Sequence, residues 1–201
     1  MRSILVEDLI KKESEYVLNQ EVYDDLNESV QTIDSRSKGL VTFLKSYRDY
    51  TDLPKPVMQK IAIADLLKSV NQLMDSGNSI QISFSCVPEN LELMADKNLI
   101  EQVLINLIKN ASEAFTSSNQ SPTIEVKAYQ YKQFKIIQVT DNGVGIVPEA
   151  LEKIFIPFYT NKKQGSGIGL SLSKQIMNLH HGELSVESIP NEGTTFKLKF
   201  I

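Results

Sequence analysis

Four short motifs follow one another over the second half of this 201-residue chain, and they constrain its fold more than any other feature. They are Asn106-Leu-Ile-Lys-Asn110, Asp141-Asn-Gly-Val-Gly145, Gly165-Ser-Gly-Ile-Gly-Leu170 and Gly193-Thr-Thr195. Two asparagines one helical turn apart suit a hydrated cation, and a glycine-rich loop that opens a helix suits phosphate. We therefore expect a fold that brings these distant segments together around one nucleotide site.

Composition and charge exclude several classes of protein. The net charge of -4 and the pI of about 5.3 argue against a nucleic-acid binder, which would be basic. The chain has no run of about 18 apolar residues, so we expect no membrane segment in it. Cys86 is the only cysteine, which fits a reducing compartment and predicts a cytoplasmic location, or the cytoplasmic part of a membrane-bound sensor.

The first 52 residues are predicted to be helical. One stretch, 21–51, has an apolar seam with a period of 3.5 residues, as in a coiled coil or tight bundle. The seam consists of Leu26, Val30, Ile33, Ser37, Leu40, Leu44 and Tyr47. With a shorter helix at 4–18 it would form a hairpin, which a dimer partner or the rest of the chain should cover. The alternative is a single helix that packs on its own domain.

Beyond a linker at Leu53-Pro-Lys-Pro56 the chain becomes mixed. Periodicity predicts helices at 63–74, 96–115 and 166–179 and a short one after Pro148. Alternating apolar residues predict strands at 80–85, 124–131, 134–140, 182–188 and 194–200, with a hairpin turn at Lys132-Gln133. Because helices and strands do not alternate strictly, we expect an α+β fold with a mixed or antiparallel sheet and helices on one face.

Each motif has a simple structural interpretation as well. Asn106 and Asn110 align with Gln102 beside the apolar arc of a helix, where they could hold Mg²⁺ or be plain surface residues. Asp141 at a strand end could accept a hydrogen bond from an exocyclic amine, although Asp-Asn-Gly is also a common turn. The loop at 165–170 has neither the βαβ context of a dinucleotide fingerprint nor a P-loop ending. Lys162 could meet phosphate, or be a solvated lysine.

Taken in order, the motifs resemble the boxes of the catalytic and ATP-binding domain of sensor histidine kinases, in the wider family of gyrase, Hsp90, MutL and histidine kinase ATPases. The asparagine helix resembles the N box, and 141–145 and 165–170 resemble the two glycine boxes. Phe155-Ile-Pro-Phe158-Tyr-Thr-Asn-Lys162 resembles the F box, and Gly193-Thr-Thr-Phe196 the closing motif. The resemblance covers about 57–201 and implies a two-layer α/β sandwich of the Bergerat type, with a flexible lid over about 146–167.

The resemblance also implies roles for individual residues. Asn106 and Asn110 would bind Mg²⁺ and phosphate, Asp141 the adenine amino group, and Phe155 and Phe158 would anchor the lid. Asn106 and Lys162 would be the catalytic residues. The full set of implied nucleotide-binding residues is Asn106, Asn110, Asp141, Gly143, Gly145, Lys162, Gly165, Gly167, Gly169, Leu170 and Thr195.

Two positions separate branches of the family. Relatives that hydrolyse ATP or phosphorylate serine place a glutamate, the general base, where this chain has Asn106. An amide cannot take a proton, so the resemblance implies phosphoryl transfer to histidine. Many sensor kinases have a basic residue where this chain has Glu113, and we expect no phosphate contact there.

The helices at the N-terminus resemble part of a dimerisation and phosphoacceptor hairpin, which predicts domains at 1–54 and 55–201. No acceptor histidine in a His-Glu context is present, since the only histidines are His180 and His181, near a helix end. We therefore expect a fragment that begins after the acceptor, binds ATP and Mg²⁺, forms a homodimer through its first helices and serves a response regulator receiver domain. The alternatives are a Mg²⁺-dependent ATPase or serine kinase, and a non-catalytic dimerisation module.

Overall fold

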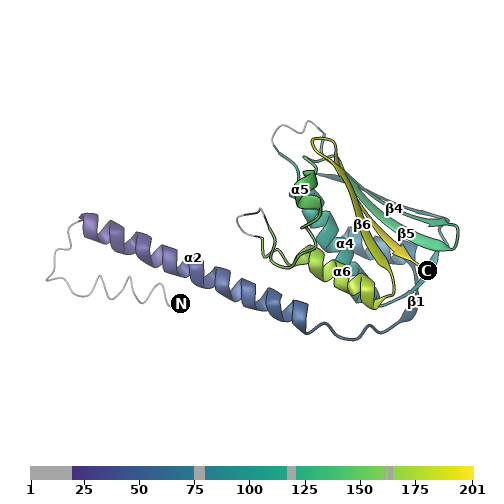
Figure 1. The fold of residues 1–201 in the computed structure, drawn as a ribbon, viewed down its shortest axis with the longest axis horizontal. Helices are drawn as coiled ribbons and strands as arrows, with labels where there is room; N and C mark the ends of the chain where they lie inside the picture. The colour runs from purple at the N-terminus through teal and green to yellow at the C-terminus, as the bar shows by residue number, and fades with distance from the viewer. Residues whose placement is uncertain (1–19, 75–79, 117–120, 161, 163–164) are drawn as a thin grey trace. The chain divides into compact units, whose positions relative to one another are not determined.

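The computed structural model describes residues 20–74, 80–116, 121–160, 162 and 165–201 (Figure 1). The chain divides into two compact units between Lys45 and Ser46, inside a long helix. The predicted boundary at residues 54 and 55 stays a prediction, and the helix expected at 4–18 lies outside the described residues. No helix in the described ranges is long and apolar enough to cross a membrane.

Helix α2 (Gln20–Thr51) accounts for nearly all of the described part of the first unit and confirms the helix expected at 21–51. Its apolar seam is open to solvent within the single chain. Ile33 is 65% exposed, Leu40 59% and Leu44 55%. Such a row of exposed large apolar side chains is costly in water, and its 3.5-residue period is the period of a coiled coil.

The second unit contains two sheets and the helices that cover one of them. A small antiparallel sheet joins β1 (Gln59–Ala62) to β3 (Glu92–Ala95). The main sheet has the order β2-β4-β5-β7-β6, from β2 (Gln81–Val87), β4 (Thr123–Tyr131), β5 (Phe134–Asp141), β7 (Gly193–Phe200) and β6 (Glu183–Ile189). Among the described strands of this sheet only β2 and β4 pair in parallel, so of the two predicted arrangements, mixed or antiparallel, the sheet has the mixed one.

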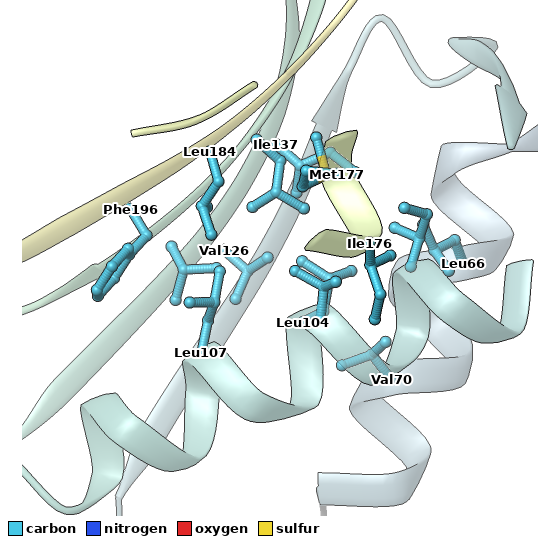
Figure 2. Packing of buried hydrophobic residues seen from close by; sticks show 14 of the residues in the cluster. Leu66, Val70, Leu104, Leu107, Val126, Ile137, Ile176, Met177, Leu184 and Phe196 are labelled. Atoms are coloured by element: carbon cyan, nitrogen blue, oxygen red, sulfur yellow. The ribbon is translucent and has the colours of Figure 1, made fainter. Parts of the chain in front are cut away.

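Three helices supply the second layer: α3 (Ile63–Met74), α4 (Lys97–Ser112) and α6 (Gly169–Leu179). A short α5 (Pro148–Leu151) follows β5 and begins at the proline, as predicted. Figure 2 shows Leu66 and Val70 from α3 near Leu104 from α4 and Ile176 from α6. All four side chains are fully buried, so the helices form a single core with one face of the sheet.

The start of α4 and the end of α6 are joined by a buried histidine. Asp96 caps α4, because its Oδ1 accepts from the backbone N–H of Leu99 at 3.2 Å. The backbone N–H of Asp96 donates to His180 Nε2 at 3.0 Å, so in the neutral ring the proton is on Nδ1, which lies 2.8 Å from the carbonyl oxygen of Ile176. The imidazole thus satisfies one backbone group from each helix.

We predict that His180→Ala lowers the free energy of unfolding by about 1–3 kcal/mol, because the backbone N–H of Asp96 loses its partner and the carbonyl of Ile176 keeps only the backbone N–H of residue 180. Urea denaturation of the second unit measures this change. The matched control is His181→Asn: His181 is exposed and has a φ of 54°, which asparagine also tolerates. Equal losses in both variants would contradict the assigned role of His180.

Candidate nucleotide site

The asparagine edge of α4 faces the beginning of α6. The apolar face of α4 is buried, which leaves Asn106 and Asn110 half-buried at its border. Asn106 Nδ2 donates to Ser173 Oγ at 2.9 Å. A Cβ atom added to Gly169 would lie 2.2 Å from Asn106 Oδ1, so no side chain fits at position 169. The first turn of α6 is therefore packed directly against the amide of Asn106.

The loop before α6 presents backbone N–H groups where a phosphate could bind. Gly169 and Leu170 are the first two residues of α6, and the first N–H groups of a helix have no partner within it. Gly167 has a φ of 68° and its carbonyl oxygen accepts from the backbone N–H of Phe158 at 2.9 Å. A Cβ at Gly167 would lie 2.5 Å from Phe158, so this glycine allows the 156–160 and 165–168 segments to touch. Gly165 lies beside Thr160 in the same loop.

Lys162 lies at the asparagine edge of α4. Its Nζ donates to Asn110 Oδ1 at 3.0 Å and forms an ion pair with Glu113. The ammonium group is thus next to the amide oxygen expected to bind Mg²⁺ and phosphate. Glu113 thus neutralises the charge of Lys162, the residue that we expect to contact phosphate.

Asp141 forms the other end of the site, at the end of β5. It is only 6% exposed, and its Oδ1 accepts from the backbone N–H of Gly143 at 2.9 Å. Burial raises the pKa of the Asp141 carboxyl, although hydrogen bonds from the N–H groups of Gly143 and Thr194 lower it in part. A buried acceptor of this kind can read an exocyclic amine.

The turn after Asp141 is held between α4 and the hairpin of β6 and β7. Val144 donates its backbone N–H to the carbonyl of Ala114, just past the end of α4, at 3.0 Å. Its own carbonyl accepts from the backbone N–H of Asn191 at 2.8 Å. Gly145 has a φ of 68°, and a Cβ there would lie 2.2 Å from the carbonyl oxygen of Ile189. Only glycine fits this close approach.

The end of α4 connects the part of the site around Asn106 with the part around Asp141. A Cβ at Gly143 would lie 2.7 Å from the Cβ of Ala114, four residues after Asn110. The Asp141–Gly145 turn therefore continues the line that Asn106 and Asn110 form along α4. Two groups of predicted residues, one around Asn106 and one around Asp141, are thus brought together by α4.

The structure does not bring the Thr195 side chain to Asp141. Thr195 Oγ1 lies 3.1 Å from Thr140 Oγ1, and residues 140 and 195 alternate with the inward-facing residues of β5 and β7. Its neighbour Thr194 is the buried threonine, 5% exposed and paired in register with Asp141. The alternation of Phe196, Leu198 and Phe200 already indicates that even-numbered residues of β7 face the core, and this signal could have identified Thr194.

The segment expected to form a lid is partly attached to the core. Ala150 and Ile154 are buried, and Phe155 packs against the core with Lys174 Nζ 4.6 Å from its ring centroid. Phe158 is 41% exposed, and its ring is stacked on that of Tyr47 with 6.3 Å between the centroids. Whether the rest of the segment moves over a nucleotide stays a prediction.

The donor set suits Mg²⁺ that is shared with a phosphate. Within the described ranges, no three His, Cys, Asp or Glu residues cluster into a metal site. Asn106 uses its amide nitrogen on Ser173, which leaves its oxygen free to face a cation, and Asn110 Oδ1 already accepts from the Lys162 ammonium. Two neutral oxygens bind Mg²⁺ weakly on their own, so phosphate oxygens and water would complete its shell.

We predict that Asp141→Asn stabilises the nucleotide-free protein at neutral pH. Because the folded state raises the pKa of Asp141, the neutral carboxyl favours folding, and this contribution is lost as the pH rises through the raised pKa. Asparagine keeps an acceptor for the two N–H groups and has no charge to bury. The gain in free energy of unfolding, measured in urea, should shrink as the pH falls below the raised pKa. A variant that is less stable than the parent at neutral pH would contradict this cause.

Comparison with known proteins agrees with this geometry. Residues 95–201 match the family model described as histidine kinase-, DNA gyrase B-, and HSP90-like ATPase. The signal transduction histidine-protein kinase AtoS of Escherichia coli (strain K12) is 30% identical over 190 residues, which are 90% of this chain and 30% of AtoS. The chain therefore spans less than a third of that relative.

Solved structures are similar as well. The catalytic domain of histidine kinase ThkA is 31% identical, with a TM-score of 0.63, over 71% of this chain and 94% of that domain. The structure of ThkA in complex with the response regulator protein TrrA has the same fold, with a TM-score of 0.69 at 24% identity over 98% of this chain and 56% of that one. The chain belongs to the histidine kinase-, DNA gyrase B- and HSP90-like ATPase family, and its second unit is a histidine kinase catalytic domain.

Proposed function

We propose that this chain is the ATP-binding part of a two-component sensor histidine kinase and donates the γ-phosphoryl group of ATP to a histidine outside this sequence. The observation that carries the proposal is the amide of Asn106, held between Ser173 and Gly169 at the position where ATP-hydrolysing relatives have a glutamate. Because an amide cannot accept a proton, the site cannot activate water through this residue. A neutral imidazole already has a lone pair and needs no base at that point.

The remaining residues bind and position the nucleotide. Asp141 would accept from the adenine amino group, and the N–H groups of Gly169 and Leu170 with Lys162 would face the phosphates. Asn106 and Asn110 would hold Mg²⁺, which supplies charge neutralisation on the phosphates when it is bound. Transfer would break the bond between the γ-phosphorus and the β,γ-bridging oxygen, with ADP as the leaving group, and form a phosphorus–nitrogen bond. The other nitrogen of the imidazole would release its proton to water.

We further propose that Thr194 takes the place beside the adenine that sequence reasoning assigned to Thr195. Its burial and its pairing with Asp141 support this exchange. Gly143 and Gly145 would shape the pocket through the close contacts of their turn with Ala114 and Ile189. Gly165 and Gly167 would shape the loop that leads to the phosphate-facing N–H groups of Gly169 and Leu170, through their close contacts with Thr160 and Phe158.

Two partners follow from the helical unit and the family. The exposed seam of α2 supports a homodimer in which two copies bury their apolar rows against each other. The complex of ThkA with TrrA supports a response regulator receiver domain as the protein that accepts the phosphoryl group next. The absence of a spanning helix in the described part of the chain is compatible with the cytoplasmic site of such a reaction.

Incubation with Mg²⁺ and γ-labelled ATP tests the proposed function. We expect the chain to bind ATP by calorimetry, Asp141→Asn to weaken binding at least about tenfold, and no acid-labile phosphate to form on the chain itself. Self-phosphorylation would show that His180 or His181 is an acceptor after all. Steady-state hydrolysis would favour the ATPase alternative, and the absence of any nucleotide binding would favour the dimerisation module.

We predict that Glu113→Gln strengthens ATP binding about two- to fivefold, because the phosphates no longer compete with a carboxylate for the Lys162 ammonium. Adenosine, which has no phosphate, should bind as before. The matched control is Glu92→Gln, whose carboxylate pairs with Lys60 at 2.6 Å outside the candidate site. An equal gain for adenosine, or a loss of ATP affinity, would show that Glu113 does not act through Lys162.

A further inference from the structure

Ser188 joins three parts of the adenine end of the site: β6, β7 and the start of the 146–167 segment. Its Oγ lies on β6 in register with Thr194 on β7, which in turn pairs with Asp141 on β5. These three side chains therefore form a row across the inner face of the sheet. Ser188 Oγ also accepts from the backbone N–H of Ile146 at 2.8 Å, where the 146–167 segment begins.

The hydrogen bonds of Ser188 determine the direction of the neighbouring hydroxyl. Ser188 Oγ donates its single proton to the carbonyl of Gly193 at 2.8 Å. It lies 2.9 Å from Thr194 Oγ1, and because its proton is already used, Thr194 must be the donor in that bond. The proton of Thr194 therefore points towards β6, and only its lone pairs remain for the side of Asp141.

We propose that Ser188 is a positioning residue for base recognition, one that makes Thr194 an acceptor beside Asp141 and ties the start of the 146–167 segment to β6. The proposal rests on the proposed function, because it concerns the same adenine site. Two acceptors side by side favour a 6-amino purine, which donates from its amino group directly or through water. They disfavour a 6-oxo purine, which presents a carbonyl at that place.

The same serine also sets the position of the turn that carries the site. The N–H of Ile146 follows directly after Gly145, whose backbone lies so close to the carbonyl of Ile189 that no Cβ atom would fit there. Ser188 thus both orients the hydroxyl of Thr194 and holds the backbone N–H of Ile146. Removal of its hydroxyl should disturb both, whereas removal of the Thr194 hydroxyl should disturb only base recognition.

The test compares the affinities for ATP and ITP, which carry the same phosphates and differ at the 6-position and N1 of the base. We expect the parent to prefer ATP, and Ser188→Ala to reduce the ratio of the two affinities about tenfold. In a Thr194→Val background the same change should have little further effect on the ratio, since both act through one hydroxyl. The control is Ser185→Ala, on the same strand but on the opposite face.

A second readout separates positioning from a general loss of structure. Hydrogen exchange at the Ile146 amide should become faster in Ser188→Ala and stay unchanged in Thr194→Val. Should Ser188→Ala fail to fold, Ser188→Thr and Ser188→Val provide a pair that differs only in a hydroxyl against a methyl group. The threonine variant is expected to keep the preference for ATP and the valine variant to lose it.

The outcomes distinguish this inference from the proposed function. A parent that binds neither ATP nor ITP overturns the proposed function. A parent that prefers ATP, with a ratio that stays within twofold in Ser188→Ala and Ser188→Val, overturns the role of Ser188 alone. A ratio that falls equally in Ser185→Ala would also overturn it, because that side chain has no contact with the row.

Discussion

The burial of one face of α4 is the interaction on which the site depends. Ile100, Leu104, Leu107 and Ile108 are fully buried against the sheet and the neighbouring helices. With this many side chains in place the helix cannot rotate about its axis without exposing one of them to water. The positions of Asn106 and Asn110, and of Ala114 beyond them, follow from that constraint. The polar edge of α4 that carries Asn106 and Asn110 is therefore held in one orientation and forms one side of the site.

The charged groups at the two ends of the site, Lys162 with Glu113 at one end and Asp141 at the other, differ in their exposure to water. Next to Asn110, the side chains of Lys162 and Glu113 are exposed, so their ion pair is weak and open to exchange with a phosphate. At the other end the carboxylate of Asp141 is buried, so its ionisation costs stability, and a ligand that donates a hydrogen bond to it would offset this cost. The end of the site at Lys162 therefore suits reversible binding of phosphate, and the end at Asp141 suits selective recognition of the base.

Local patterns in the sequence predicted most of the elements, because the forces that form them are local. Periodicity predicts the helix at 63–74, turn chemistry predicts the hairpin turn at Lys132-Gln133, and the structure confirms both. Strand β1 was missed, since only Ile61 of its four residues is buried and its partner lies about thirty residues away. The ion pair of Lys162 with Glu113 joins positions 49 apart and has no local signal. The choice between Thr194 and Thr195 depends on which face each side chain takes.

The place of β7 in the sheet has a consequence for how the protein is made. Although β7 follows β6 in the sequence, it lies between β5 and β6, and it supplies Thr194 next to Asp141. The middle of the sheet therefore stays open until β7 has left the ribosome. During synthesis the base end of the site cannot exist, even when α4 and its asparagines are already folded. A newly made chain can therefore recognise a nucleotide base only once β7 has paired with β5 and Thr194 lies beside Asp141.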